Sequence, residues 1–268
     1  MKRGIGGAVK AAAAGVDVLR PASPGLVILI YHRVGGRSAS QIDLSTARFD
    51  AQVAELADAR RLVSLDEGLR RLEAADLADC PVVLTFDDGT ADWVDEALPV
   101  LVRHGVPATF YVATDFVERG VPFPADGQPI SWSGLAELVA SGLATIGSHT
   151  HTHALLDRAD GPEAASELDR STDLLGERLG IECAHFAYPK ALRGSPAAER
   201  EVRGRFRSAT LAGSRANEAG ADVHRLTRTP IQVADGMRWF RRKAAGGMRL
   251  EDSARSLLNR GRYAGATT

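Results

Sequence analysis

The stretch VVLTFDDGT, residues 82–90, is the most informative part of the sequence for the fold, and it raises the first question about chemistry. Apolar and β-branched residues run from Val82 to Phe86, a pattern typical of a buried strand. Two adjacent carboxylates, Asp87 and Asp88, follow directly and precede a glycine. Like charges repel each other at the end of an apolar strand, and burial penalises the ionisation of both. The pair therefore needs either a partner that stabilises two charges or a local turn that exposes them.

Further strand-like runs alternate with helix-like segments along most of the chain. The expected strands are 25–32, 81–86, 107–113, 143–149, 183–189, 207–213 and 228–233, and the expected helices are 44–59, 65–75, 91–105, 131–142 and 163–179. Such alternation predicts an α/β fold with a parallel sheet, either open or closed into a barrel. The carboxyl ends of parallel strands gather on one face, so His32, Asp87, Asp88 and His149 are expected at one rim.

Composition sets the limits on domain organisation and partners. A chain of 268 residues with 44% hydrophobic residues is compatible with one large α/β domain, here expected over 25–235. The formal net charge of −1 gives no general attraction to nucleic acid. Residues 1–24 read as a short helical extension rather than a secretory signal, because Lys10 and Asp17 interrupt the apolar run. We therefore expect a cytoplasmic protein, with membrane association as an alternative.

The last segment, 236–268, is expected to be a basic C-terminal tail. It is rich in arginine, with scattered Trp239, Phe240, Leu257 and Leu258. Such a segment either touches an anionic membrane surface as a peripheral contact or forms a solvated helix packed by its few apolar residues.

Three histidines alternate in GSHTHTHALL, residues 147–156. In an extended chain His149, His151 and His153 share one face, whereas a helical turn places His149 and His153 together and turns His151 away. Two imidazoles and one carboxylate with an open position form a common divalent-metal site. The alternative is a histidine-rich surface turn, with the Asp–Asp–Gly segment as an ordinary turn that caps the next helix. A bound cation explains the adjacent Asp87 and Asp88 better than a turn does, because it neutralises one carboxylate and leaves the other ionised as a base.

TFDDG (85–89) followed by HTHTH (149–153) resembles the first two motifs of the polysaccharide deacetylases, carbohydrate esterase family four, also called the nodulation-protein-B homology domain. The runs PATFYV and IGSHT are also similar to the family, so the resemblance covers roughly 25–235. It implies a single-domain, deformed (β/α)7-type barrel. It further implies Asp87 as the general base, and Asp88, His149 and His153 as ligands of one divalent ion, Zn²⁺ by family.

Two motifs depart from the family pattern. The segment FAYPKA (186–191) corresponds to the family's third motif, and in it Ala187 stands where many members have an arginine that orients the base. Arg228 is a candidate replacement for this arginine and is also expected to contact the substrate. The alternative is that it caps surface carbonyls, which is the more ordinary role for an arginine beside a strand. The late histidine of the general acid is absent near the C-terminus. His32 in ILIYHRV takes that place if the chain resembles permuted members; otherwise it is a structural histidine bonded to backbone.

The expected function is metal-dependent removal of acetyl groups from an N-acetylated saccharide, in a polysaccharide such as an exopolysaccharide or in its lipid-linked precursor. Trp132 and Tyr188 are expected to line the sugar groove, because aromatic faces suit pyranose rings. One alternative is a catalytically inactive barrel that binds carbohydrate, which the missing third-motif arginine favours. Another is a deacetylase or deformylase of a small molecule or cyclic imide.

Overall fold

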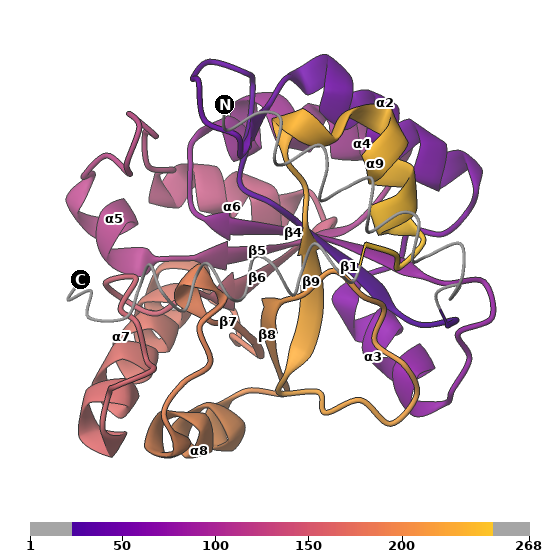
Figure 1. Cartoon of the computed structure of the whole chain (residues 1–268). Coiled ribbons are helices and arrows are strands. Elements are labelled where there is room, and N and C mark those ends of the chain that lie inside the picture. Colours follow the sequence, from indigo (N-terminus) through magenta and orange to yellow (C-terminus); the bar gives the residue numbers. More distant parts are fainter. Residues whose placement is uncertain (1–22, 249–268) are drawn as a thin grey trace, which may run out of the picture.

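A closed ring of parallel strands forms the centre of the computed structural model, which describes residues 23–248 (Figure 1). Neighbouring strands follow the order β1-β4-β5-β6-β7-β8-β9, and β9 pairs with β1 to close the barrel. The barrel strands are β1 (Val27–Tyr31), β4 (Val82–Asp88), β5 (Ala108–Val112), β6 (Ala144–Ser148), β7 (His185–Ala187), β8 (Ser208–Ala212) and β9 (Leu226–Pro230). The prediction of a single α/β domain built on a (β/α)7-type barrel is confirmed.

The strands are apolar because both of their faces are covered. Every residue of β1 is buried, as expected where one face of a strand meets the barrel interior and the other meets helices. Aromatic rings fill the helix-facing side, where Phe86 stacks on Phe110 at a centroid distance of 4.8 Å. The hydrogen-bonded pairing of strands is shortest between β6 and β7, which share one paired position, Ser148 and Phe186. Strands β6 and β7 are therefore the least extensively paired neighbours in the barrel.

Helices cover the outside of the barrel. They are α2 (Thr46–Asp58), α3 (Leu65–Glu73), the π-helical η1 (Trp93–Ala97), α4 (Leu98–His104), α5 (Thr114–Arg119), α6 (Trp132–Ala140), α7 (Gly161–Leu179), the 3-10 turn η2 (Pro189–Ala191), α8 (Pro196–Arg205), the 3-10 turn η3 (Val233–Asp235) and α9 (Gly236–Ala244). A two-stranded pair, β2 (Arg33–Val34) and β3 (Asp43–Leu44), lies outside the ring. Ser45, Ser64 and Ser131 cap α2, α3 and α6 by accepting backbone N–H bonds.

Helix α3 closes the amino-terminal end of the barrel. Its Gly68 lies so close to the interior side chains that an added Cβ would come within 2.8 Å of Leu26 and 3.1 Å of Val83. Leu65 and Leu72 of the same helix are buried with these two residues in one apolar cluster. The opposite end, formed by the carboxyl ends of the strands with His32, Asp88 and His149, is called the mouth below.

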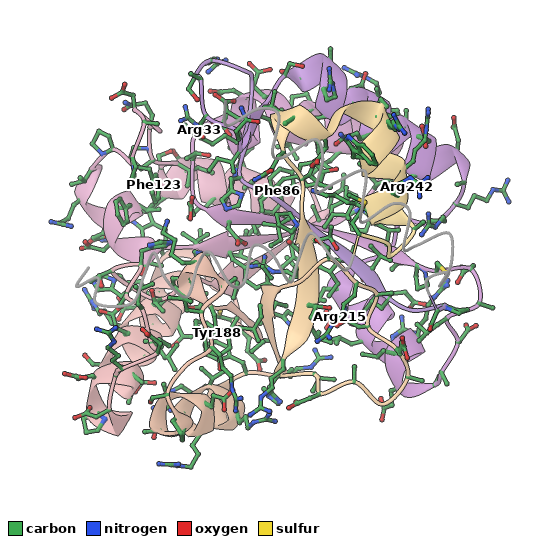
Figure 2. The ribbon with its side chains drawn as sticks, in the orientation of Figure 1. Arg33, Phe86, Phe123, Tyr188, Arg215 and Arg242 are labelled. Atoms are coloured by element: carbon green, nitrogen blue, oxygen red, sulfur yellow. The ribbon has the colours of Figure 1, made fainter. Side chains whose placement is uncertain are left out.

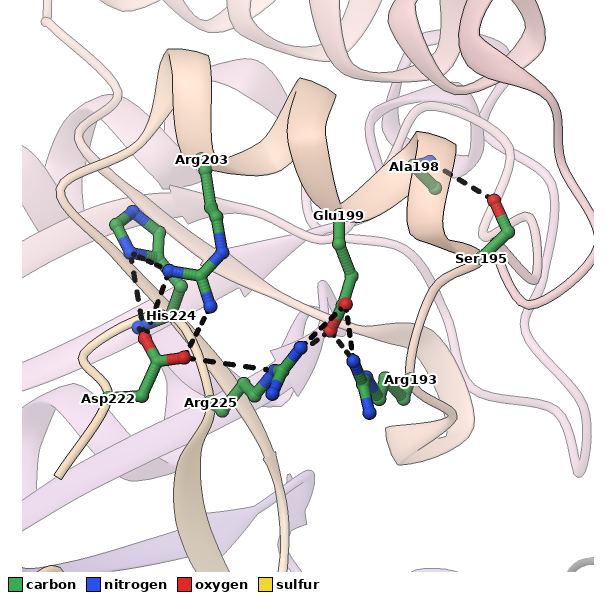
Figure 3. Close-up of polar contacts among 8 residues, drawn as sticks. All are labelled: Arg193, Ser195, Ala198, Glu199, Arg203, Asp222, His224 and Arg225. Carbon is green, nitrogen blue, oxygen red and sulfur yellow. Dashed lines mark hydrogen bonds and ion pairs between the residues drawn. The ribbon is translucent and has the colours of Figure 1, made fainter.

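An ionic network fastens α8 to the loop before β9 (Figure 3). The carboxylate of Glu199 accepts hydrogen bonds from Arg193 at 2.6 and 2.7 Å and from Arg225 at 3.0 and 2.8 Å. Further along the same helix, Arg203 pairs with Asp222. The network therefore ties together three segments that are separate in sequence.

The folded unit extends past the expected boundary at residue 235. Helix α9, expected as the start of a tail, buries Phe240, and its Lys243 forms a fully buried ion pair with Asp235 at 2.9 Å. The helix also packs on α2 (Figure 1). The expected helix in 1–24 and the rest of the basic tail lie outside the described residues, apart from 23–24 and 245–248. In the part of the chain that the structure describes, no helix combines the length and the apolar character needed to cross a bilayer.

Candidate active site and metal centre

Asp87 lies inside the barrel, at the end of β4, and is bound by an arginine from the last strand. Arg228 of β9 donates from Nη1 to Oδ1 of Asp87 at 2.6 Å and from Nη2 to Oδ2 at 2.7 Å. Nη1 also donates to the hydroxyl of Thr85 at 3.0 Å. The side chains of Arg228 and Asp87 are 1% and 6% exposed. A bidentate pair of this kind fixes both the position and the plane of a carboxylate.

The surroundings of Arg228 keep Asp87 ionised. The guanidinium lies 5.0 Å from the centre of the Tyr111 ring, a cation–π contact that supports it from one side. Burial alone raises the pKa of Asp87, but Arg228, His149 and His32 outweigh it and hold this pKa below its ordinary value. The interpretation of Arg228 as a cap of surface carbonyls is therefore wrong. The side chain is buried and faces the carboxylate that the missing third-motif arginine was expected to orient.

Asp88 ends β4 in an unusual backbone conformation that breaks the strand. Its φ is 87°, and Gly89 follows with φ of 120°, which side chains with a Cβ rarely adopt. Oδ1 of Asp88 lies 3.7 Å from Nε2 of His149 and 3.5 Å from Nε2 of His153. One donor atom from each of these three residues lies within 4.8 Å of the other two. Two imidazoles and a carboxylate at this spacing fit a divalent metal ion with an open coordination position.

The orientation of His149 is fixed by the backbone of β7. Nδ1 of His149 lies 2.7 Å from the carbonyl oxygen of Ala187. Since a carbonyl oxygen can only accept a hydrogen bond, Nδ1 is the donor and carries the proton. Nε2 is then left with its lone pair directed toward Asp88, the tautomer that a metal ligand requires. Burial lowers the pKa of His149 to about 4, so the ring is neutral at neutral pH. The sequence pattern did not reveal this contact, although FAYPKA marks the strand that provides it.

The histidine-rich segment brings His149 and His153 together without forming a helix. Thr150 and His153 have φ values of 65° and 63°, so the chain folds back within five residues. The ring centroids of His149 and His153 are 5.1 Å apart. His151 points away and pairs through Nδ1 with Thr114 Oγ1 at 2.9 Å. The expected grouping is present, but left-handed residues produce it rather than the helical turn considered from the sequence.

His32 lies at the mouth, next to the two aspartates. Its electrostatic influence lowers the pKa of both Asp87 and Asp88, and its own backbone carbonyl accepts a hydrogen bond from Trp93 Nε1 at 2.7 Å. The ring is half-buried, and its Nδ1 has no hydrogen-bond partner among residues 23–248. A purely structural histidine would use this nitrogen to bind backbone. The backbone hydrogen bond expected of a structural histidine is therefore not formed by Nδ1 within residues 23–248.

The structure gives the two aromatic residues expected in the sugar groove different surroundings. Tyr188 is 1% exposed and packs edge-on against Phe186, on the helix-facing side of β7 (Figure 2). The expectation that it lines the groove is wrong, because strand alternation turns it out of the barrel. Trp132 is half-buried at the start of α6, where its Nε1 donates to Glu118 at 2.8 Å. Arg178 lies 5.8 Å from the centre of its ring, so this face is already covered.

Comparisons with known proteins agree with this geometry. Residues 75–202 match the family model of the polysaccharide deacetylases. IcaB from Ammonifex degensii superposes with a TM-score of 0.70 at 27% identity, over 82% of this chain and 98% of that one. The deacetylase PplD of Streptococcus pyogenes, solved in complex with acetate, superposes with a TM-score of 0.73 at 23% identity, over 83% and 99% of the two chains.

A curated relative extends the comparison to sequence. The uncharacterised protein YlxY of Bacillus subtilis is 24% identical over 98 residues, which are 37% of this chain and 27% of YlxY. The match thus spans about a quarter of that relative's length. The two motifs at the mouth lie within residues 75–202, the part of the chain that is similar to the polysaccharide deacetylase family.

Proposed function

We propose that this chain hydrolyses N-acetyl groups on amino sugars of a polysaccharide or of its precursor. One observation carries the proposal: an ionised carboxylate, Asp87, lies beside a cluster of donors from Asp88, His149 and His153. The cluster offers the two imidazoles and one carboxylate that a catalytic metal site uses, and Asp87 stays outside it because Arg228 holds both of its oxygens. Such an arrangement provides an electrophile and a base side by side.

Asp88, His149 and His153 would hold one divalent ion, for which we propose zinc. When bound, the ion supplies a Lewis acid that polarises the amide carbonyl and lowers the pKa of water. The protein side of the site suits this role, because His149 is neutral and oriented by Ala187. The carboxylate of Asp88 supplies a negative charge close to both Nε2 atoms.

Asp87 would accept a proton in the reaction, and His32 would donate one. Asp87 accepts one proton from the attacking water, whose oxygen forms a new bond to the acetyl carbon. Arg228 takes one lone pair from each oxygen of Asp87, which leaves each oxygen a second lone pair that can accept a proton. The carbon–nitrogen bond then breaks while His32 donates a proton to the leaving nitrogen. The products are acetate and the free amino sugar.

The rival function, an inactive barrel that binds carbohydrate, rested on the absence of an arginine in the third motif. Arg228 places a guanidinium against Asp87 from a different strand, which removes the main argument for inactivity. We therefore favour turnover over binding alone.

The test is acetate release by the full chain supplied with zinc. Substrates are tetramers of N-acetylglucosamine with β-1,4 and β-1,6 linkages, followed by ion chromatography of acetate and by fluorescent labelling of free amines. We expect Asp87→Asn to lower kcat by about 10²–10⁴-fold, the usual contribution of a general base. Asp95→Asn, on the exposed side of η1, is the matched control and should retain activity. Binding of the tetramers without any acetate release by the wild type would favour the inactive barrel instead.

A further inference from the structure

Polar side chains gather inside the barrel around the pair formed by Asp87 and Arg228. The register of β4 and β5 places Thr85 beside Thr109 and Asp87 beside Tyr111. Registered partners on neighbouring parallel strands face the same side of the sheet, so Thr109 and Tyr111 point into the barrel with the other two. Arg228 joins them from β9, because its Nη1 donates to both Thr85 and Asp87. The interior of the barrel is therefore polar at this level.

Three polar atoms in this group have no hydrogen-bond partner among residues 23–248. They are Nε of Arg228, Oη of Tyr111 and Oγ1 of Thr109, and none of the three residues is more than 1% exposed. The two terminal nitrogens of Arg228 are already engaged, so Nε is the guanidinium nitrogen that is left. An unpartnered polar atom costs free energy when it is buried, and nearly all buried polar atoms in folded proteins have a partner. Three such atoms around one guanidinium indicate a partner from outside the chain.

The chemistry of these atoms defines that partner. Nε can only donate a hydrogen bond, whereas a hydroxyl group can also accept one. Thr210 lies close to the Tyr111 hydroxyl, but its own proton goes to the carbonyl of Phe186 at 3.3 Å, so the lone pairs of Tyr111 stay free. The partner must accept from Nε and donate to hydroxyl oxygens. It must also be neutral, because Asp87 already balances the charge of Arg228.

Water has this combination of properties and is small enough for an enclosed site. Buried waters in proteins typically make about three hydrogen bonds to polar groups, which equals the number of atoms available here. The Tyr111 ring lies 5.0 Å from the guanidinium carbon of Arg228, and Thr109 adjoins Thr85, which Arg228 binds at 3.0 Å. Both hydroxyl-bearing residues therefore lie next to the guanidinium that needs an acceptor.

A hydrogen bond at Nε would complete the restraint on Arg228. Asp87 and Thr85 hold the far end of the guanidinium, and Nε is its nitrogen nearest the backbone. A bond to Nε lies in the plane of the group, so it resists rotation of that plane away from the carboxylate. The orientation of Asp87 would then depend on residues that lie behind Arg228 and do not touch Asp87 through a hydrogen bond.

We propose that the barrel interior binds one ordered water between Arg228, Tyr111 and Thr109, and that Tyr111 and Thr109 are positioning residues that act through this water and Arg228 on Asp87. The water site stands on the buried atoms alone, whereas its effect on catalysis rests on the proposed function. A displaced base lowers kcat, because the reacting atoms are no longer aligned. KM should change little, because these side chains are buried beneath the pair and do not bind the substrate.

The kinetic experiment measures acetate release from the β-1,4-linked tetramer of N-acetylglucosamine by zinc-supplied variants. Thr109→Val replaces the hydroxyl with a methyl group of similar size, and we expect kcat to fall about tenfold while KM stays within about twofold. Thr109→Ser keeps the hydroxyl and should keep the kcat of the wild type. Thr172→Val is the matched control, because the hydroxyl of Thr172 lies on α7 and bonds to its own helix.

Tyr111→Phe is the second variant. It keeps the ring against Arg228 and removes only the hydroxyl, so it should lower kcat in the same way as Thr109→Val. Unfolding in urea adds a test of sign. A hydroxyl that binds water stabilises the fold, so both variants should unfold at lower urea than the wild type. A buried hydroxyl without any partner destabilises the fold, and its removal would raise the midpoint instead.

A crystal structure of the wild type examines the site directly. We expect an ordered water within about 3.2 Å of Nε of Arg228, displaced or lost in Thr109→Val. No water at Nε, together with raised urea midpoints, would overturn the water site. A water at Nε with unchanged kcat in both variants would overturn the positioning role. If the wild type releases no acetate, the proposed function fails, and the crystal structure and the urea midpoints still decide whether the water is bound.

Discussion

Arg228 and Asp87 are 141 residues apart in sequence and bind each other through both carboxylate oxygens. Their strands, β9 and β4, are not neighbours, because β1 lies between them in the barrel. The pair therefore reaches across the interior, where both side chains are almost fully buried. A buried charge pair of this kind depends on each member for the solvation that water would otherwise provide.

Arg228→Gln should therefore destabilise the protein strongly. The substitution leaves Asp87 buried without its partner, a change that costs about 3–5 kcal/mol in comparable pairs. The double variant Asp87→Asn/Arg228→Gln removes both charges and should regain a large part of the lost stability. Urea unfolding of the wild type, the single variants Asp87→Asn and Arg228→Gln, and the double variant gives the coupling energy. Additive effects would show that the pair is not coupled.

Metal content should depend on His149 and not on His151. Wild-type protein supplied with zinc and then desalted should retain about one divalent ion per chain by mass spectrometry. His149→Ala should lose it, because the ring that Ala187 orients toward Asp88 is gone. His151→Ala changes the same segment but removes a ring that faces Thr114, and it should retain the ion. Loss of metal in both variants would point to general disruption of the turn.

Glycine-to-alanine changes at 147 and 204 should have opposite signs. A Cβ at Gly147 would lie 2.7 Å from Cδ1 of Tyr111 and 2.8 Å from the carbonyl oxygen of His185. Overpacking of this kind costs about 1–3 kcal/mol, and here it also displaces the ring beneath Arg228. A Cβ at Gly204, in α8, meets nothing within 4 Å and should stabilise the helix by about 0.5 kcal/mol. Thermal unfolding of both variants tests the two signs together.

The ionic network on α8 should make stability depend on pH. Hydrogen bonds from Arg193, and then from Arg225, lower the pKa of Glu199 to about 2 against the effect of burial. A carboxyl group whose pKa is lower in the folded state stabilises the fold above its ordinary pKa of about 4.5, and this stability is lost as pH falls toward 2. Both arginines are more than one-third exposed, so solvent screening limits the contribution to about 1 kcal/mol.

Glu199→Gln provides the corresponding measurement. Its unfolding free energy in urea should lie below that of the wild type at pH 7, and the gap should narrow between pH 4.5 and pH 3. Glu201→Gln, on the same helix, is a suitable control because Glu201 pairs with Arg205 in the adjoining turn and not with Arg193 or Arg225. A gap that does not change with pH would mean that the charge of Glu199 contributes nothing.

The order of strands and helices could be predicted because it depends on local patterns. Apolar runs such as 82–86 have few alternatives to a buried parallel strand, and each of the seven expected runs overlaps a barrel strand. Helices α5 and α8 were not predicted. Helix α8 has few apolar residues, and a proline at its first position and the cap at Ser195 define its start instead.

The site could be predicted in part for a similar reason. Strand ends meet at one rim of a parallel barrel, so the cluster of Asp88, His149 and His153 follows from topology. The role of Arg228 could not be predicted from topology, because it depends on whether the side chain of Arg228 points into the closed barrel or out of it. Tyr188 is a second example of a side-chain direction that the sequence does not reveal. It directly follows Ala187, the last residue of β7, whose carbonyl binds His149, but the ring of Tyr188 is buried under the helices.

Because Arg228 lies in the last strand, the residues of the proposed site are not all translated together. Asp87, Asp88, His149 and His153 leave the ribosome long before Arg228, and the match to the family ends at residue 202. A nascent chain, or a proteolytic fragment, that stops there carries every recognisable motif but lacks the strand that closes the barrel on β1. Such a fragment would therefore contain the motifs of the proposed site without the arginine that binds both oxygens of Asp87.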